Sequence, residues 1–131
     1  MKIIKIFLVI ILLNITNSLF SQNDSLRFYT KVSKKTLTIN EKFRVDFKFN
    51  VDGNDFNPPN FEGFKVVGGP NQSVSNMYVN GKRKYNKTYS YFLVPIKKGL
   101  LSIGSASIEY DRVYETKSVN INVPRIIKSN K

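Results

Sequence analysis

Three residue types are missing from this chain of 131 residues, which contains no histidine, no cysteine and no tryptophan. Without cysteine there can be no disulfide bond and no thiolate nucleophile. Without histidine and cysteine the usual zinc sites cannot form, and a Ser-His-Asp triad is impossible. We therefore expect a protein that is not an enzyme and that carries no metal and no cofactor.

Acidic residues are scarce as well, with 9 Asp and Glu against 21 Lys and Arg, so the formal net charge is +12. Such an excess bears on partners and solubility rather than on fold. Acidic protein surfaces and anionic lipid headgroups suit a basic chain, so protein partners and peripheral membrane association are both expectations. A generally basic surface without a specific acidic partner is the simpler alternative. Nucleic acid is not expected as a partner, because the N-terminus predicts export.

The longest apolar run lies at the N-terminus, where Lys2 and Lys5 lead into eight apolar residues, Ile6 to Leu13. A membrane-spanning helix needs about 20 apolar residues, so this order is typical of a secretory signal peptide. An uncleaved N-terminal anchor is the alternative. We predict three segments: a signal peptide at 1–21, a β-sandwich at 22–124 and a basic polar tail at 125–131.

After residue 22 the apolar residues recur with a period of two, as in half-buried strands, and no helical period is convincing. The clearest run comprises Phe43, Val45, Phe47 and Phe49, of which at least three should be buried. Asn80-Gly81 between Ser73–Val79 and Lys82–Val94 predicts a tight hairpin. The pattern predicts an all-β fold, an immunoglobulin-like β-sandwich of about 7–9 antiparallel strands.

Several interruptions carry more local predictions. Thr36–Ile39 should form a strand that a turn at Asn40-Glu41 connects to the next one. Phe64–Val67 should form a short strand that Gly68-Gly69-Pro70 ends, since glycine and proline interrupt strands. The apolar phase slips at Gly104-Ser105, which predicts a β-bulge.

The Pro-Pro loop from Asn54 to Gly63 is the leading candidate for an interaction site. Prolines cannot donate to a strand ladder, so this stretch should be an irregular loop or a sheet edge. Pro58 and Pro59 should also stiffen it, and a stiff loop loses little entropy on binding. Its candidate residues are Asn57, Pro58, Pro59, Asn60, Phe61 and Glu62. The simpler alternative is that Phe56 and Phe61 only attach the loop to the core.

A basic hairpin is the second candidate. Its cations are Lys82, Arg83, Lys84 and Lys87, interleaved with tyrosines at strand spacing. Core or cross-strand packing explains the tyrosines, and lysines commonly protect a sheet edge. The cluster is therefore either a solvated face or an interaction surface.

Carboxylates are the only acid–base candidates. Asp52, Asp55 and Glu62 surround the Pro-Pro loop, but a glycosidase needs two carboxylates facing each other across a cleft. Asp52-Gly53-Asn54-Asp55 could offer oxygen ligands to calcium, although it lacks the spacing of a calcium loop. We expect a solvated turn here.

Several segments together resemble the first periplasmic domain of the BatD (Bacteroides aerotolerance) family. They are Asn40–Val45, Asn57–Ser73, Asn80–Lys82, Tyr89–Tyr91 and Pro95–Gly99. The segment Pro58-Pro59-Asn60-Phe61-Glu62-Gly63-Phe64 is the most specific of these. The likeness covers roughly residues 26–123.

The resemblance implies an exported protein of the bacterial periplasm or cell envelope, in a family with several β domains and usually a C-terminal transmembrane helix. It implies a scaffold role in an envelope complex linked to oxygen or stress tolerance. The implied partners are membrane proteins with von Willebrand factor A domains and, indirectly, a MoxR-type ATPase. It provides no catalytic residues. A carbohydrate- or ligand-binding surface module is the alternative function, weakened by the absence of tryptophan.

Overall fold

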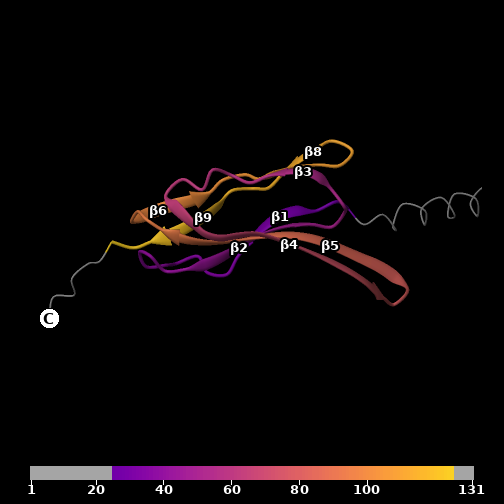
Figure 1. Cartoon of the computed structure of the whole chain (residues 1–131), viewed down its shortest axis with the longest axis horizontal. Coiled ribbons are helices and arrows are strands. Elements are labelled where there is room, and N and C mark those ends of the chain that lie inside the picture. Colours follow the sequence, from indigo (N-terminus) through magenta and orange to yellow (C-terminus); the bar gives the residue numbers. More distant parts are fainter. Residues whose placement is uncertain (1–24, 126–131) are drawn as a thin grey trace, which may run out of the picture.

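The computed structural model describes residues 25–125, which form nine β-strands and no helix (Figure 1). The strands are β1 (Phe28–Val32), β2 (Phe43–Phe49), β3 (Asn54–Asn57), β4 (Phe64–Val79), β5 (Lys82–Pro95), β6 (Gly99–Ile103), β7 (Ser107–Glu109), β8 (Val113–Glu115) and β9 (Val119–Val123). The predicted all-β fold is confirmed. No helix that could cross a membrane occurs between residues 25 and 125. The signal peptide predicted at 1–21 lies outside the described residues, as does nearly all of the predicted tail.

Four antiparallel strands form the first layer, in the order β1-β2-β5-β4. Phe47 of β2 lies opposite Thr30 of β1 and Tyr89 of β5. Because side chains alternate along a strand, the odd-numbered residues of β2 and β5 point toward the core. The four predicted core residues of β2 are all buried: Phe43, Val45, Phe47 and Phe49. That prediction is confirmed.

The second layer faces this sheet and consists of β3-β7-β8 together with the pair β6-β9 (Figure 1). The segment before β2 runs beside β9, where the N–H of Leu37 donates to the carbonyl of Asn122 at 2.9 Å. Thr36 forms only an isolated parallel bridge to Asn122. The predicted strand at Thr36–Ile39 is therefore wrong, because the chain follows β9 briefly and then turns at Asn40 (φ 63°) toward β2.

At Gly104-Ser105, where a β-bulge was predicted, the chain instead crosses from one sheet to another. β6 ends at Ile103, which pairs with Val119 of β9, whereas β7 begins at Ser107 and pairs with Glu115 of β8. Ile103 and Ala106 are both fully buried on either side of the crossing. The apolar phase slips because the chain exchanges one hydrogen-bonding partner for another.

β4 is much longer than the short strand predicted at Phe64–Val67. It continues through Gly68-Gly69-Pro70 with shifts in its register against β5. Gly69 has φ 88°, and a Cβ there would lie 2.3 Å from the carbonyl oxygen of Ser90. Glycine therefore lets β4 bulge closely over β5 and continue, so the predicted strand end is wrong.

Aromatic rings fill the space between the layers. Phe56 of β3 stacks on Tyr89 with centroids 4.0 Å apart and planes at 3°. Phe61 is buried, with its ring centroid 5.1 Å from that of Tyr91 and 6.2 Å from that of Phe47. Both phenylalanines therefore attach the Pro-Pro loop to the core, as expected.

The Pro-Pro loop begins as a sheet edge, one of the two forms predicted for it. Asn54 pairs with Glu109, and Asn57 pairs with Ser107 across a register irregularity, which makes Asn54–Asn57 a short strand. The two prolines follow this strand, so they do not interrupt its hydrogen bonds with β7.

Candidate interaction surface

The carboxylates of the described residues do not gather into a metal-binding group. No set of three acidic side chains between residues 25 and 125 lies close enough together to hold a metal ion. Asp55 and Glu62 are exposed, and Asp52 pairs with Lys87. Asp46 is buried, where it accepts a 2.6 Å hydrogen bond from the Ser90 hydroxyl and lies 3.0 Å from Arg44. The exposed surfaces remain as candidate sites.

The Pro-Pro loop presents a polar surface. Exposed residues of the candidate site are Asn57, Pro58, Asn60 and Glu62, whereas Pro59 is half-buried and Phe61 is buried. The loop returns to the β6 end of the sandwich, where the Gly63 carbonyl accepts a 2.9 Å hydrogen bond from the Ile96 N–H (Figure 1). Because its aromatic residues face the core, only small and polar groups remain for a partner.

The β4–β5 hairpin projects beyond the sandwich (Figure 1). β2 pairs with β5 only from Leu93 to Lys87, so the residues beyond that point pair only with each other. We call this segment, Ser75–Asn86, the arm. Its tip is the predicted Asn80-Gly81 turn, with φ values of 52° and 75°, as a two-residue hairpin turn with two left-handed positions requires.

Large apolar side chains of the arm are exposed to solvent. Tyr78 is 74% exposed, Met77 is 55% exposed and Val79 is 39% exposed. They belong to β4, the edge strand of the first layer, whose stretch Val66–Val79 contains no charged residue. Edge strands usually carry charges that oppose pairing with other chains. An uncharged edge with exposed apolar groups is typical of an interaction surface.

β5 supplies the charge of the arm. The register of β5 against β4 places Lys82 opposite Val79, Arg83 opposite Tyr78 and Lys84 opposite Met77. The Nε of Arg83 donates to Oδ1 of Asn76 at 2.8 Å, and its guanidinium lies 5.4 Å from the centroid of the Tyr85 ring. Both contacts orient the guanidinium without neutralising its charge, which leaves it available to an anionic partner.

Lys87 plays a different part from the other three predicted cations. Its side chain is only 13% exposed, and its Nζ lies 2.9 Å from Oδ1 of Asp52. The hydrogen bond from Lys87 and the attraction of its charge lower the pKa of Asp52. The same hydrogen bond raises the pKa of Lys87. This pair ties β5 to the chain after β2 and so belongs to the framework of the arm.

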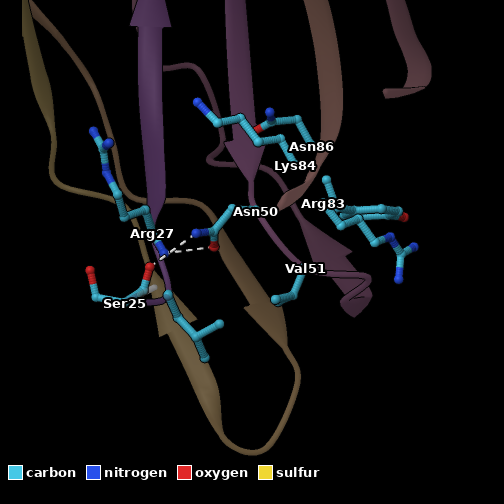
Figure 2. Close-up of a pocket in the computed structure, with 9 residues that line it drawn as sticks. Ser25, Arg27, Asn50, Val51, Arg83, Lys84 and Asn86 are labelled. Atoms are coloured by element: carbon cyan, nitrogen blue, oxygen red, sulfur yellow. Dashed lines mark hydrogen bonds between the residues drawn. The ribbon is translucent and has the colours of Figure 1, made fainter. Parts of the chain in front are cut away.

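A groove of about 430 Å³ opens at the base of the arm (Figure 2). One wall is Ser25–Arg27, the other is Arg83–Asn86, and Asn50 and Val51 lie between them. Asn50 holds the first wall, since its Oδ1 accepts from the Arg27 N–H at 2.8 Å and its Nδ2 donates to the Ser25 carbonyl at 3.0 Å. Arg27, Arg83 and Lys84 make this groove basic.

Tyr85 adds a hydroxyl to the same groove. Burial, assisted by the negative charge of Asp52, raises the pKa of Tyr85. A second hollow, lined in part by Asp52 and Tyr110, shares this tyrosine and extends the groove.

The structure thus separates the two predicted sites. Lys82, Arg83 and Lys84 lie together on the arm, while the Pro-Pro loop lies toward the opposite end of the sandwich (Figure 1). Arg27 and Asn50 were not predicted as site residues. They join the groove only because β1 and β5 flank β2, and no local pattern in the sequence signals this.

The family model described as BatD DUF11 like domain matches residues 30–123. No curated protein and no solved structure matches the chain.

Proposed function

Because the chain belongs to the BatD family, we propose that it is a non-catalytic protein-interaction module of a bacterial envelope complex. Export to the periplasm or cell envelope, and a link to oxygen or stress tolerance, are parts of this proposal. They are supported by the family and by the signal-like sequence at residues 1–21.

The arm is the observation that carries the proposal. It combines unpaired strand edges, exposed apolar side chains and three exposed cations on a segment held by few contacts with the sandwich. Isolated two-stranded hairpins are only marginally stable in water. A partner that covers the arm would bury apolar area and satisfy its free backbone groups.

We further propose membrane proteins with von Willebrand factor A domains as the direct partners, with a MoxR-type ATPase acting through them. The support is the family resemblance, together with a surface suited to protein rather than to a small molecule. The Pro-Pro loop is the competing contact surface, through Asn57, Asn60 and Glu62.

The test compares two variants of residues 22–131 for binding to purified von Willebrand factor A domains from the same host. One variant lacks Asn76–Val79 and Lys82–Tyr85, which shortens the arm but keeps the Asn80-Gly81 turn. The other carries Asn57→Ala, Asn60→Ala and Glu62→Ala. We expect the shortened arm to abolish binding and the loop variant to retain it.

The opposite pattern would place the contact on the Pro-Pro loop. If the unmodified domain binds none of these partners, the proposed partner class is wrong.

A further inference from the structure

The groove at the base of the arm is the place that β2 would occupy if it were longer. β2 ends at Phe49, which pairs with Phe28 of β1 on one side and with Lys87 of β5 on the other. Both neighbours extend past that point, as Ser25–Arg27 and as Arg83–Asn86, and these are the two walls of the groove. β2 separates these two strands up to Phe49, so the gap begins at the point where the strand between them ends.

The β5 wall of this gap has a free edge. From Lys82 to Asn86, β5 pairs with β4 alone, whereas from Lys87 onward it also pairs with β2. Backbone N–H and C=O groups of a strand point alternately to its two sides. The groups on the side of the gap therefore lack a strand partner, and an added strand would satisfy them.

The gap is also selective for charge. Its walls carry Arg27, Arg83 and Lys84, and the sequence contains no acidic residue from Phe64 to Ile108. Asp52, which follows β2, is already paired with Lys87. Arg83 and Lys84 are consecutive in a strand, so their side chains point to opposite faces of the sheet.

We propose that this gap binds an extended, acidic segment of a partner protein, which adds as a strand to the free edge of β5. Two adjacent acidic residues of that segment lie across from Arg83 and Lys84, one on each face, as favourable cross-strand pairs. This inference rests on the proposed interaction function and names the chemistry of the partner.

A second copy of the chain does not suit this gap. The described residues contain 17 Lys and Arg against 8 Asp and Glu, and each arm carries three cations without an acidic residue. Two such arms would repel each other, whereas an acidic segment is attracted.

The probe is a capped peptide, Thr-Val-Glu-Asp-Val-Thr, titrated into ¹⁵N-labelled residues 22–131 at low salt. We expect the largest NMR shift changes at the amides of Lys82–Asn86, Ser25–Arg27 and Asn50. The neutral peptide Thr-Val-Gln-Asn-Val-Thr should bind at least about tenfold more weakly, because it lacks the charge pairs. The acidic peptide with N-methyl groups on both valines should also bind weakly, since each edge then loses an N–H.

Charge reversal on the protein provides the matching variants. Arg83→Glu with Lys84→Glu should weaken binding of the acidic peptide at least about tenfold. Lys97→Glu with Lys98→Glu makes the same change of charge in an exposed turn outside the groove and should change affinity much less. Thermal unfolding of both double variants establishes that each is folded.

Three outcomes would overturn the inference. The NMR shift changes could be confined to the outer edge of β4 at Asn71–Val79, or the N-methylated peptide could bind as tightly as the unmethylated acidic peptide. The third is an equal loss of peptide affinity in both double variants. A domain that binds von Willebrand factor A proteins through the arm but ignores the acidic peptide disproves strand addition and leaves the proposed function intact. A domain that binds the peptide in the gap but none of those proteins supports strand addition and contradicts the proposed partner class.

Discussion

Phe47 lies in the aromatic cluster between the two layers, with its ring centroid 5.6 Å from that of Phe56 and 5.9 Å from that of Tyr91. Its side chain is fully buried. Interiors of proteins are close-packed, so a deleted ring leaves a cavity that neighbours fill only in part.

Phe47→Ala should therefore lower the free energy of unfolding by about 3–5 kcal/mol. Met77→Ala on the exposed arm is the matched control and should change it by less than about 0.5 kcal/mol. Chemical denaturation followed by circular dichroism measures both. A loss below about 1 kcal/mol for Phe47→Ala would contradict the assignment of this side chain to the core.

The Asp52–Lys87 pair predicts a dependence of stability on pH. The pKa of Asp52 is lower in the folded chain than its ordinary value of 3.8, so the unfolded chain takes up protons first as the pH falls. The stability contributed by the Asp52 carboxylate is therefore present above pH 3.8 and disappears as the pH falls through the lower folded pKa.

Asp52→Asn should make the protein less stable at pH 7, because the poorly exposed Lys87 ammonium loses its counter-ion. The difference from the unmodified protein should be smaller at pH 3 than at pH 7, because below pH 3.8 the unfolded chain is already taking up the proton. Urea titrations at the two pH values provide the measurement, with Asp55→Asn showing the general effect of removing one negative charge. A difference that persists undiminished at the acidic pH would assign the effect to something other than this carboxylate.

At the scale of elements, the β4–β5 hairpin serves two purposes. Its proximal half belongs to the core, where Tyr89, Tyr91 and Leu93 are buried. Its distal half, the arm, exposes Met77, Tyr78 and Val79. One continuous hairpin thus joins a rigid framework to a projecting surface, which positions the arm without a separate domain.

Removing Asn76–Val79 and Lys82–Tyr85 should leave the sandwich folded, with a free energy of unfolding changed by no more than about 1 kcal/mol, because these residues bury little apolar area. The deletion removes four residues from each strand, so the Asn80-Gly81 turn keeps its register. Circular dichroism and thermal unfolding provide the check. Global unfolding would show that the arm is part of the folding core.

At the scale of the whole molecule, the positive charge and the N-terminal sequence bear on where the protein acts. Lys2 and Lys5 before the apolar run at 6–13 predict export and cleavage near Gln22. Mass spectrometry of the protein from its native host should find the N-terminus at or close to Gln22. An intact segment 1–21 in a membrane fraction would instead identify an anchor.

Local sequence signals predicted the elements that they control directly. The alternation at Phe43–Phe49 and the Asn80-Gly81 turn are both as predicted, since burial period and turn geometry depend on neighbouring residues. The strand end predicted at Gly68-Gly69-Pro70 is wrong, because pairing with β5 carries β4 past a local interruption. The basic cluster Lys82–Lys84 is visible as a run of neighbouring residues in the sequence. The groove beside it could not be predicted from the sequence.

The fold class, the core face of β2 and the hairpin tip follow from the order of the residues, because period and turn chemistry are short-range properties of the chain. Three other features depend on the folded arrangement: the pairing of Lys87 with Asp52, the crossing between sheets at Gly104-Ser105, and the position of Ser25–Arg27 facing Arg83–Asn86. These facts depend on which strands become neighbours. Neighbours are selected by burial and hydrogen bonding across the whole sandwich, at separations over which local patterns carry no information.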